Sequence, residues 1–92
     1  MKQLCINVLN EVGLHARLAA QFVKSAAKYQ SEIHLRNITR ASDWASAKSI
    51  LEVLTLGVEQ NHKIEITFSG VDEEEAAREI ENLIRGNFVP SE

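Results

Sequence analysis

Hydrophobic and polar residues alternate along three stretches of the chain. Over residues 3–9 every second residue is hydrophobic, and residues 32–36 and 63–69 repeat the pattern. A period of two is typical of strands with one buried and one solvated face, as in antiparallel sheets. We also predict a shorter strand over residues 41–45, which would pair with strand 32–36 across a loop at residues 37–40.

Three other segments carry their hydrophobic residues at helical spacing. The pattern predicts helices over residues 16–28, 50–56 and 73–85. Gly57 and Gly86 follow the second and third of these segments, where glycine commonly ends a helix. The predicted order of elements is therefore strand, helix, strand, strand, helix, strand, helix.

An acidic run marks the start of the last predicted helix. Asp72 stands at the N-cap position with Glu75 three residues further on, which is the spacing of a capping box. The negative charges of Glu73, Glu74 and Glu75 also complement the positive end of the helix dipole. We interpret the run as helix capping and not as a metal or partner site.

The order of elements predicts the fold class. One face of the sheet is polar, so all three helices must cover the other face. We expect an α+β fold in which three helices cover one face of a four-stranded antiparallel sheet (βαββαβα). Ninety-two residues have room for one hydrophobic core, so residues 1–92 are expected to form a single domain.

Composition and charge narrow the possible functions. Hydrophobic residues make up 45% of the chain and charged residues 25%, as in ordinary globular proteins. No apolar run approaches the roughly 20 residues that span a bilayer, and the amino terminus lacks a signal-peptide pattern. A net charge of −3 without a Lys/Arg cluster argues against nucleic-acid binding. The single cysteine, Cys5, excludes an intrachain disulfide and a cysteine-based zinc site, so we expect a cytoplasmic protein.

The segment between the first strand and the first helix carries the candidate chemistry. His15 occupies the N-cap position, so the backbone N–H groups after it lack helical partners and can bind an anion. The positive end of the helix favours a neutral imidazole, whose ring nitrogen can attack phosphorus. The N–H groups and the Arg17 guanidinium can then hold the phosphoryl oxygens. Gly13 permits a close approach of the chain, and Leu14 can pack back on the helix.

Local sequence alone leaves His15 open to a plainer interpretation. A histidine at a loop–helix junction is more often a capping or surface residue, and no Ser/His/Asp or Cys/His set accompanies it. The other histidines, His34 on a polar strand face and His62 in a turn, are expected to be solvated. Neither has a metal-ligand partner at a useful spacing, so we expect no metal and no cofactor.

Three collinear stretches carry a family resemblance. Residues 13–20, Gly-Leu-His-Ala-Arg-Leu-Ala-Ala, are similar to the active-site motif of the HPr family. This family comprises the histidine-containing phosphocarriers of the bacterial phosphoenolpyruvate sugar phosphotransferase system. Residues 45–58 resemble its second helix with the entry to it, and residues 69–76 resemble the entry to its last helix. The resemblance implies an open-faced β-sandwich in the order of elements given above.

The resemblance also implies a role for each residue of the first motif. By resemblance, His15 accepts a phosphoryl group on Nδ1 from phospho-enzyme I and passes it to an EIIA-type domain. Arg17 matches the active-site arginine of the family, and Ala16 and Arg17 would bind the phosphoryl group. Such a protein is a carrier rather than a stand-alone enzyme. A small carrier that exposes His15 to successive partners is most simply a monomer.

Two further family features fall on the second helix. Ser49 matches the serine that a dedicated kinase phosphorylates in many Gram-positive relatives. Ser49 and Glu52 also have capping-box spacing, and the Glu52 carboxylate would repel a phosphoserine one turn away. Val53 is expected in the core. The apolar patch that docks partners is matched by Ile50, Leu51 and Leu54.

The chain departs from the family pattern at two places. Leu18 stands where the family has proline, and leucine keeps the helix but removes the fixed φ of its first turn. We expect a less rigid phosphoryl site as a result. The loop before the second helix is longer than in typical relatives and brings Trp44, which either covers the edge of the core or belongs to a partner surface.

Two other functions stay open at this point. A regulatory homologue would act on a transcription regulator or an enzyme by contact through Ile50, Leu51 and Leu54, with phosphoryl transfer at His15 dispensable. A generic α+β module that binds nucleic acid or a small molecule is disfavoured by the acidic balance and the aromatic content of 5%. The sequence does not identify the sugar, because specificity lies in downstream partners.

Overall fold

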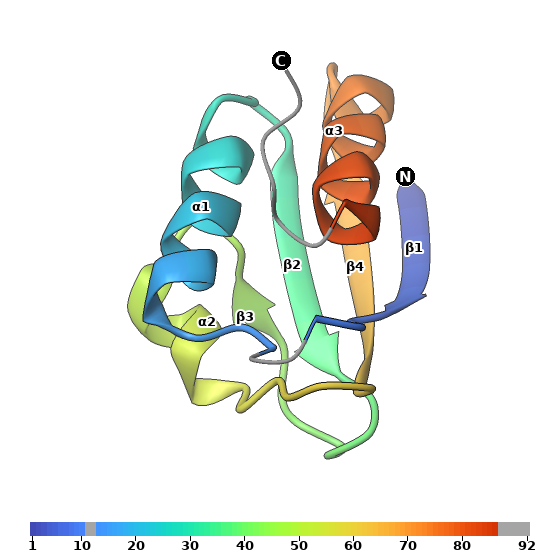
Figure 1. Cartoon of the computed structure of the whole chain (residues 1–92). Coiled ribbons are helices and arrows are strands. Elements are labelled where there is room, and N and C mark those ends of the chain that lie inside the picture. Colours follow the sequence, from blue (N-terminus) through green and yellow to red (C-terminus); the bar gives the residue numbers. More distant parts are fainter. Residues whose placement is uncertain (11–12, 87–92) are drawn as a thin grey trace.

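A computed structural model describes residues 1–10 and 13–86, which form four strands and three helices (Figure 1). The three helices agree with the predicted ranges to within one residue. The order of elements is the predicted βαββαβα. In chain order the elements are β1 (Lys2–Asn7), α1 (Ala16–Ala27), β2 (Glu32–Asn37), β3 (Ala45–Ser46), α2 (Ile50–Thr55), β4 (Lys63–Ser69) and α3 (Glu73–Arg85).

The strands form one antiparallel sheet in the order β1-β4-β2-β3. Strand β4 lies inside the sheet, where its Ile66 pairs with Leu4 of β1 on one side and with Leu35 of β2 on the other. This register places the hydrophobic residues of three strands on the same face. One face of the sheet is therefore apolar across its width.

All three helices pack on the apolar face of the sheet, and Figure 1 shows them on one side of it. Helix α1 contacts both α2 and α3, and α3 also contacts β1 and β4. Phe22 of α1 and Phe68 of β4 are fully buried, and each such side chain contributes roughly 1.5–3 kcal/mol to stability. The predicted α+β fold with one covered face is confirmed. No helix within residues 1–10 and 13–86 is long and apolar enough to cross a membrane.

The fourth strand lies later in the chain than predicted. Instead of residues 41–45, strand β3 covers Ala45–Ser46, where it pairs with β2. Ala41 adopts a φ of 51°, which lies outside the range of an extended strand. The Ser42 hydroxyl accepts a hydrogen bond from the N–H of Asn37 at 2.8 Å and closes a turn. Pairing with β2 starts only after this turn.

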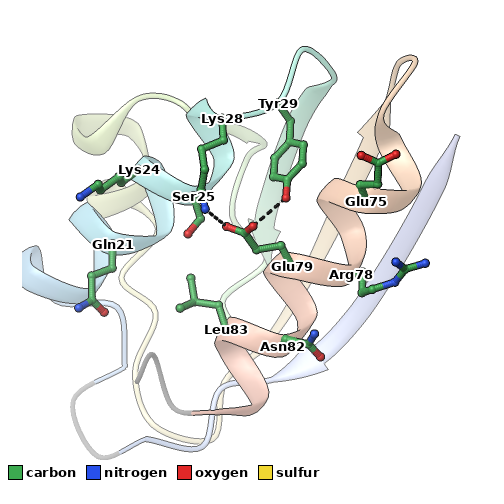
Figure 2. Close-up of a pocket in the computed structure, with 10 residues that line it drawn as sticks. All are labelled: Gln21, Lys24, Ser25, Lys28, Tyr29, Glu75, Arg78, Glu79, Asn82 and Leu83. Carbon is green, nitrogen blue, oxygen red and sulfur yellow. Dashed lines mark hydrogen bonds and ion pairs between the residues drawn. The ribbon is translucent and has the colours of Figure 1, made fainter. Parts of the chain in front are cut away.

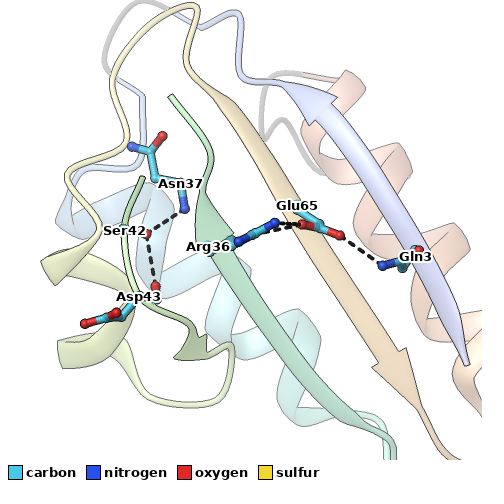
Figure 3. A network of polar contacts seen from close by, with 6 residues as sticks. All are labelled: Gln3, Arg36, Asn37, Ser42, Asp43 and Glu65. Atoms are coloured by element: carbon cyan, nitrogen blue, oxygen red, sulfur yellow. Dashed lines mark hydrogen bonds and ion pairs between the residues drawn. The ribbon is translucent and has the colours of Figure 1, made fainter. Parts of the chain in front are cut away.

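The uncovered face of the sheet carries a chain of polar contacts (Figure 3). The Glu65 carboxylate on β4 accepts hydrogen bonds from Arg36 Nε at 2.9 Å and from Gln3 Nε2 at 3.0 Å. The Arg36 guanidinium carbon also lies 4.9 Å from the centre of the Trp44 ring, a cation–π distance. Trp44 therefore packs on Arg36 and is 45% exposed. The first of its two predicted roles, covering the edge of the core, is not the one that the structure shows.

The Asp72 side chain does not cap α3, although Asp72 occupies the N-cap position. Its carboxylate accepts hydrogen bonds from the N–H groups of Gln30 and Ser31, at 2.8 and 2.9 Å, and from the Ser31 hydroxyl. Glu73 instead reaches back and accepts from the N–H of Gly70 at 3.1 Å. Asp72 thus ties the chain before β2 to the start of α3. These bonds, that of the Ser31 hydroxyl foremost, lower the pKa of Asp72.

We predict that Asp72→Asn is less stable than the unmodified chain at neutral pH and that the difference shrinks in acid. The folded-state pKa of Asp72 is lowered, so the carboxylate adds stability above its unfolded-state pKa. This contribution is lost as the pH falls through the folded-state pKa. Urea denaturation over a pH series measures both unfolding free energies. Asp43→Asn, on an exposed aspartate, is the control, and a pH-independent difference for Asp72→Asn would contradict the assignment.

Candidate functional site

His15 occupies the N-cap position of α1, as predicted. Its backbone is extended, with φ −78° and ψ 173°, and its carbonyl accepts the helical hydrogen bond of the Ala19 N–H at 2.7 Å. The imidazole makes no capping hydrogen bond and is exposed to solvent. A ring in this position can meet a reactive group on another molecule.

The first turn of α1 surrounds His15 with groups that favour an anion. The N–H groups of Ala16, Arg17 and Leu18 have no helical acceptor, as at every helix start. The turn contains no acidic residue, and Arg17 is exposed. Within the part of the chain that the structure describes, no carboxylate forms an ion pair with Arg17. The helix terminus and the guanidinium together suit a phosphoryl-sized anion.

Leucine at position 18 is compatible with this turn. Helix α1 begins at Ala16 although no proline fixes its first residues. The Leu18 side chain is partly buried and packs against the core. The Leu18 side chain thus adds a packing contact to the first turn.

The two residues before His15 fix its position. Gly13 has a φ of +59°, and a Cβ there would lie 2.2 Å from the carbonyl oxygen of Val58. The Leu14 N–H donates to this same oxygen at 2.9 Å, and the Leu14 side chain is buried. The loop is also closed on itself, because the Asn10 side chain donates to the Gly13 carbonyl at 2.8 Å. Only glycine permits the close approach at position 13.

A shallow hollow opens beside His15. Its lining comes from the end of α2, from the segment that follows α2, and from Leu14 and His15. The hollow brings together the predicted nucleophile and one residue of the predicted docking patch, which are far apart in the sequence. Its lining residues are Leu14, His15, Leu54, Gly57, Val58, Glu59 and Gln60.

The predicted docking patch lies on the exposed side of α2. Leu51 is 75% exposed, which is unusual for a leucine in a short apolar helix. Ile50 and Leu54 are also partly open to solvent, whereas Val53 is fully buried, as expected. The exposed apolar surface therefore continues from α2 to the hollow beside His15. Such a surface beside a polar site is typical of partner docking.

Ser49 is the N-cap of α2. Its hydroxyl accepts a hydrogen bond from the Glu52 N–H at 3.3 Å, so one half of the predicted capping box is present. The Glu52 carboxylate accepts from the N–H of Ser46 at 3.0 Å instead of from that of Ser49. The capping role of Ser49 is therefore structural, and a carboxylate lies one turn away from its hydroxyl.

His62 is more than the solvated turn residue that we predicted. Its Nδ1 accepts a hydrogen bond from the Glu59 N–H at 3.1 Å and lies 3.0 Å from Nδ2 of Asn37. Asn37 is completely buried. Asn37 continues the buried face of β2 after Ile33 and Leu35, so its burial follows from the period of two. The contact with His62 could not be predicted, because His62 lies in the turn before β4 and is far from Asn37 in the sequence.

A larger groove lies between α1 and α3, away from His15 (Figure 2). The Tyr29 hydroxyl donates to Glu79 at 2.7 Å, and Lys28 Nζ lies 2.6 Å from the other oxygen of that carboxylate. Burial raises the pKa of Tyr29 to about 12, and the hydrogen bond to Glu79 adds to the effect. Lys28, Tyr29 and Glu79 are thus held by one another. The candidate site is the hollow at His15, because an exposed imidazole lies there at a helix N-terminus.

The described residues contain no group of three or more His, Cys, Asp and Glu side chains that could hold a metal ion. The site presents an imidazole, a guanidinium and the free backbone N–H groups of a helix start. An exposed histidine at an anion-binding helix N-terminus, on a small open-faced α+β fold, is the arrangement that a phosphoryl carrier requires.

Comparison with known proteins places the chain within this class. Residues 2–86 match the family model described as "PTS HPr component phosphorylation site". The chain is 33% identical over 92 residues to the phosphocarrier protein HPr of Neisseria meningitidis, with 100% of both chains covered. It is also 38% identical over 77 residues to the multiphosphoryl transfer protein of Haemophilus influenzae, which covers 84% of this chain and 15% of that longer protein. The chain belongs to the HPr family, the phosphocarriers of the phosphotransferase system.

Solved structures agree with the sequence comparison. The crystal structure of HPr-C-His from Thermoanaerobacter tengcongensis has a TM-score of 0.90 and 37% identity, with 100% of both chains covered. A structure of an HPr dimer from the same organism has a TM-score of 0.75 and 38% identity, covering 98% of this chain and 100% of that one. The family fold is thus reproduced over essentially the whole chain.

We predict that Gly13→Ala destabilises the fold more than Gly57→Ala. Both glycines have φ near +60°, where an alanine costs about 1–2 kcal/mol. A Cβ at position 57 would meet only the flexible end of Arg40, whereas one at position 13 would meet the backbone of Val58. Chemical denaturation gives both unfolding free energies. Equal losses would show that the close approach at Gly13 is not a constraint.

Proposed function

We propose that the chain carries a phosphoryl group on His15 in the phosphoenolpyruvate-dependent sugar phosphotransferase system. It accepts the group from phospho-enzyme I and passes it to an EIIA-type domain. The observation that carries the proposal is the exposed His15 imidazole at the N-terminus of α1, with no capping bond of its own. The family membership supports the same conclusion.

In the transfer step, the Nδ1 lone pair of His15 attacks the phosphorus atom of the donor. The new P–N bond forms as the bond from phosphorus to the donor breaks, and the donor keeps that electron pair. Nε2 retains its proton throughout. Attack by the acceptor later reverses the step and regenerates the neutral imidazole. The phosphoryl group is neither gained nor lost overall, so the chain acts as a carrier.

The first turn of α1 would hold the phosphoryl oxygens. The N–H groups of Ala16 and Arg17 supply hydrogen bonds, and the Arg17 guanidinium supplies a positive charge. The absence of acidic residues from this turn supports the assignment. No metal or other cofactor is needed in the carrier, because the step exchanges one leaving group for another.

Partner docking belongs to the exposed side of α2. Leu54 lines the hollow that contains His15, and Ile50 and Leu51 are exposed on the same helix, so one partner surface can cover both. We assign Ser49 a structural role ahead of a regulatory one, because its hydroxyl caps α2 by accepting a hydrogen bond from the Glu52 N–H. Action of a serine kinase on Ser49 would add charge beside that carboxylate. A contact with a transcription regulator would use the same patch.

We further propose that residues 1–92 act as one unit and as a monomer in the cytoplasm. His15 must meet two different partners in turn, and a single exposed site serves this without a second copy. The related HPr dimer shows that the fold is compatible with another state. The carrier is favoured over a purely regulatory homologue because the matching family model is itself described by a phosphorylation site.

We predict that His15→Ala abolishes labelling by phosphoenolpyruvate, magnesium and enzyme I. The unmodified chain should gain one acid-labile phosphoryl group, because a phosphoimidazole P–N bond hydrolyses in acid. Intact-protein mass spectrometry before and after acid treatment measures the addition. His34→Ala, on the uncovered sheet face, should label like the unmodified chain. Absence of labelling of the unmodified chain by a matched enzyme I would contradict the proposed function.

We predict that Leu51→Ala raises the KM of enzyme I for the carrier with little change in kcat. Burial of a leucine at an interface contributes about 1.5–3 kcal/mol, which corresponds to a KM increase on the order of tenfold or more. Val71→Ala is the control, since Val71 is 86% exposed but lies in the turn before α3 and not on α2. Steady-state transfer rates give both constants. An equal rise for both variants would argue against a docking patch on α2.

A further inference from the structure

The buried side chain of Asn37 forms an unusual polar centre at the end of β2. Asn37 is 0% exposed, and among the described residues only Ser31 is another buried polar side chain. Its Nδ2 donates to the carbonyl of Leu56 at 3.1 Å, and its Oδ1 accepts from the N–H of Arg40 at 3.3 Å. The bond to Leu56 identifies Nδ2 as the end that carries the hydrogens. The same Nδ2 lies 3.0 Å from His62 Nδ1.

These contacts define the state of the His62 ring. Nδ1 faces two donors, Asn37 Nδ2 and the Glu59 N–H at 3.1 Å. A ring nitrogen that accepts from donors must carry a lone pair and no proton. In this arrangement Nδ1 is the acceptor and the ring N–H is at Nε2. An imidazolium would turn N–H toward N–H and lose both contacts.

The chain between Leu56 and His62 is held at both ends by this pair. Its middle contacts the active-site loop, because Val58 accepts from the Leu14 N–H at 2.9 Å and lies against Gly13. The same segment lines the hollow beside His15. A displacement of this segment therefore moves Leu14, and with it the residue that follows Leu14.

We propose that Asn37 and His62 are positioning residues for phosphoryl transfer at His15. They act through the segment 57–60, which fixes Leu14 and thereby the entry to α1. The expected effect on phosphoryl transfer rests on the proposed function of His15. The expected effect on the position of Leu14 does not. Neither side chain contacts His15, and neither takes part in bond formation. His62 thus acts as a hydrogen-bond acceptor, whereas His15 acts as the nucleophile.

Two substitutions at position 62 distinguish the loss of the hydrogen-bond acceptor from the loss of side-chain volume. His62→Asn places an oxygen, Oδ1, near the position of Nδ1 and keeps an acceptor, whereas His62→Ala removes it. The amide hydrogen exchange of Leu14 reports the segment directly, and that of Ala76, whose N–H donates to the Asp72 carbonyl at the start of α3, is the reference outside the segment. We expect Leu14 exchange to accelerate in His62→Ala relative to Ala76 and to recover in His62→Asn. His34→Ala is the control and should leave the ratio unchanged.

Transfer kinetics test the functional part. A nucleophile displaced by about 1 Å loses up to roughly a hundredfold in rate, and a smaller displacement loses less. We expect kcat for phosphorylation by enzyme I to fall in this range for His62→Ala, with KM nearly unchanged because Leu51 and Leu54 stay in place. His62→Asn should restore most of kcat. A loss of kcat that is equal in both variants, or a Leu14 exchange ratio unaffected by His62→Ala, would overturn the proposal.

A measurement on the unmodified chain covers the case in which His62→Ala does not fold. Nitrogen NMR of the ring should show the His62 proton on Nε2 at neutral pH. A proton on Nδ1 would overturn the proposal without any variant. Failure of the unmodified chain to accept a phosphoryl group would count against the proposed function instead, and would leave the exchange and NMR results to decide on the segment.

Discussion

The backbone hydrogen bond from Leu14 to Val58 connects the loop after β1 with the segment after α2, and the site depends on it. The bond forms only because Gly13 has no side chain and a positive φ, which lets the two segments approach closely. His15 follows directly, with its carbonyl in the first helical bond of α1. One contact thus sets both the start of the helix and the place of the imidazole.

The two faces of the sheet differ in polarity and in what covers them. The apolar face holds the helices, so that α1 is supported along its buried side while its N-terminus stays open. The polar face links three strands through Glu65, Arg36 and Gln3 and needs no covering layer. Because all helices are on one side, the N-terminus of α1 and the exposed side of α2 can form one continuous surface.

Much of the fold follows from local pattern. The period-two stretches and the helical spacings predicted the order of elements, and helix ends were correct to within one residue, because burial of one face imposes these periods. Strand β3 was misplaced, since the turn at Ala41 depends on a contact between Ser42 and Asn37. Asp72 was assigned a side-chain cap that it does not make, because its partners, Gln30 and Ser31, are distant from it in the sequence.

The sequence by itself determined that a histidine stands at a helix start with an arginine two residues on, because both features are local. The family resemblance added the chemistry of a phosphoryl carrier. Only the tertiary structure decided that Leu54 and the segment after α2 lie beside His15 and that His62 accepts from Asn37. Contacts of this kind join residues that are distant along the chain, and a pattern with a short period carries no information about them.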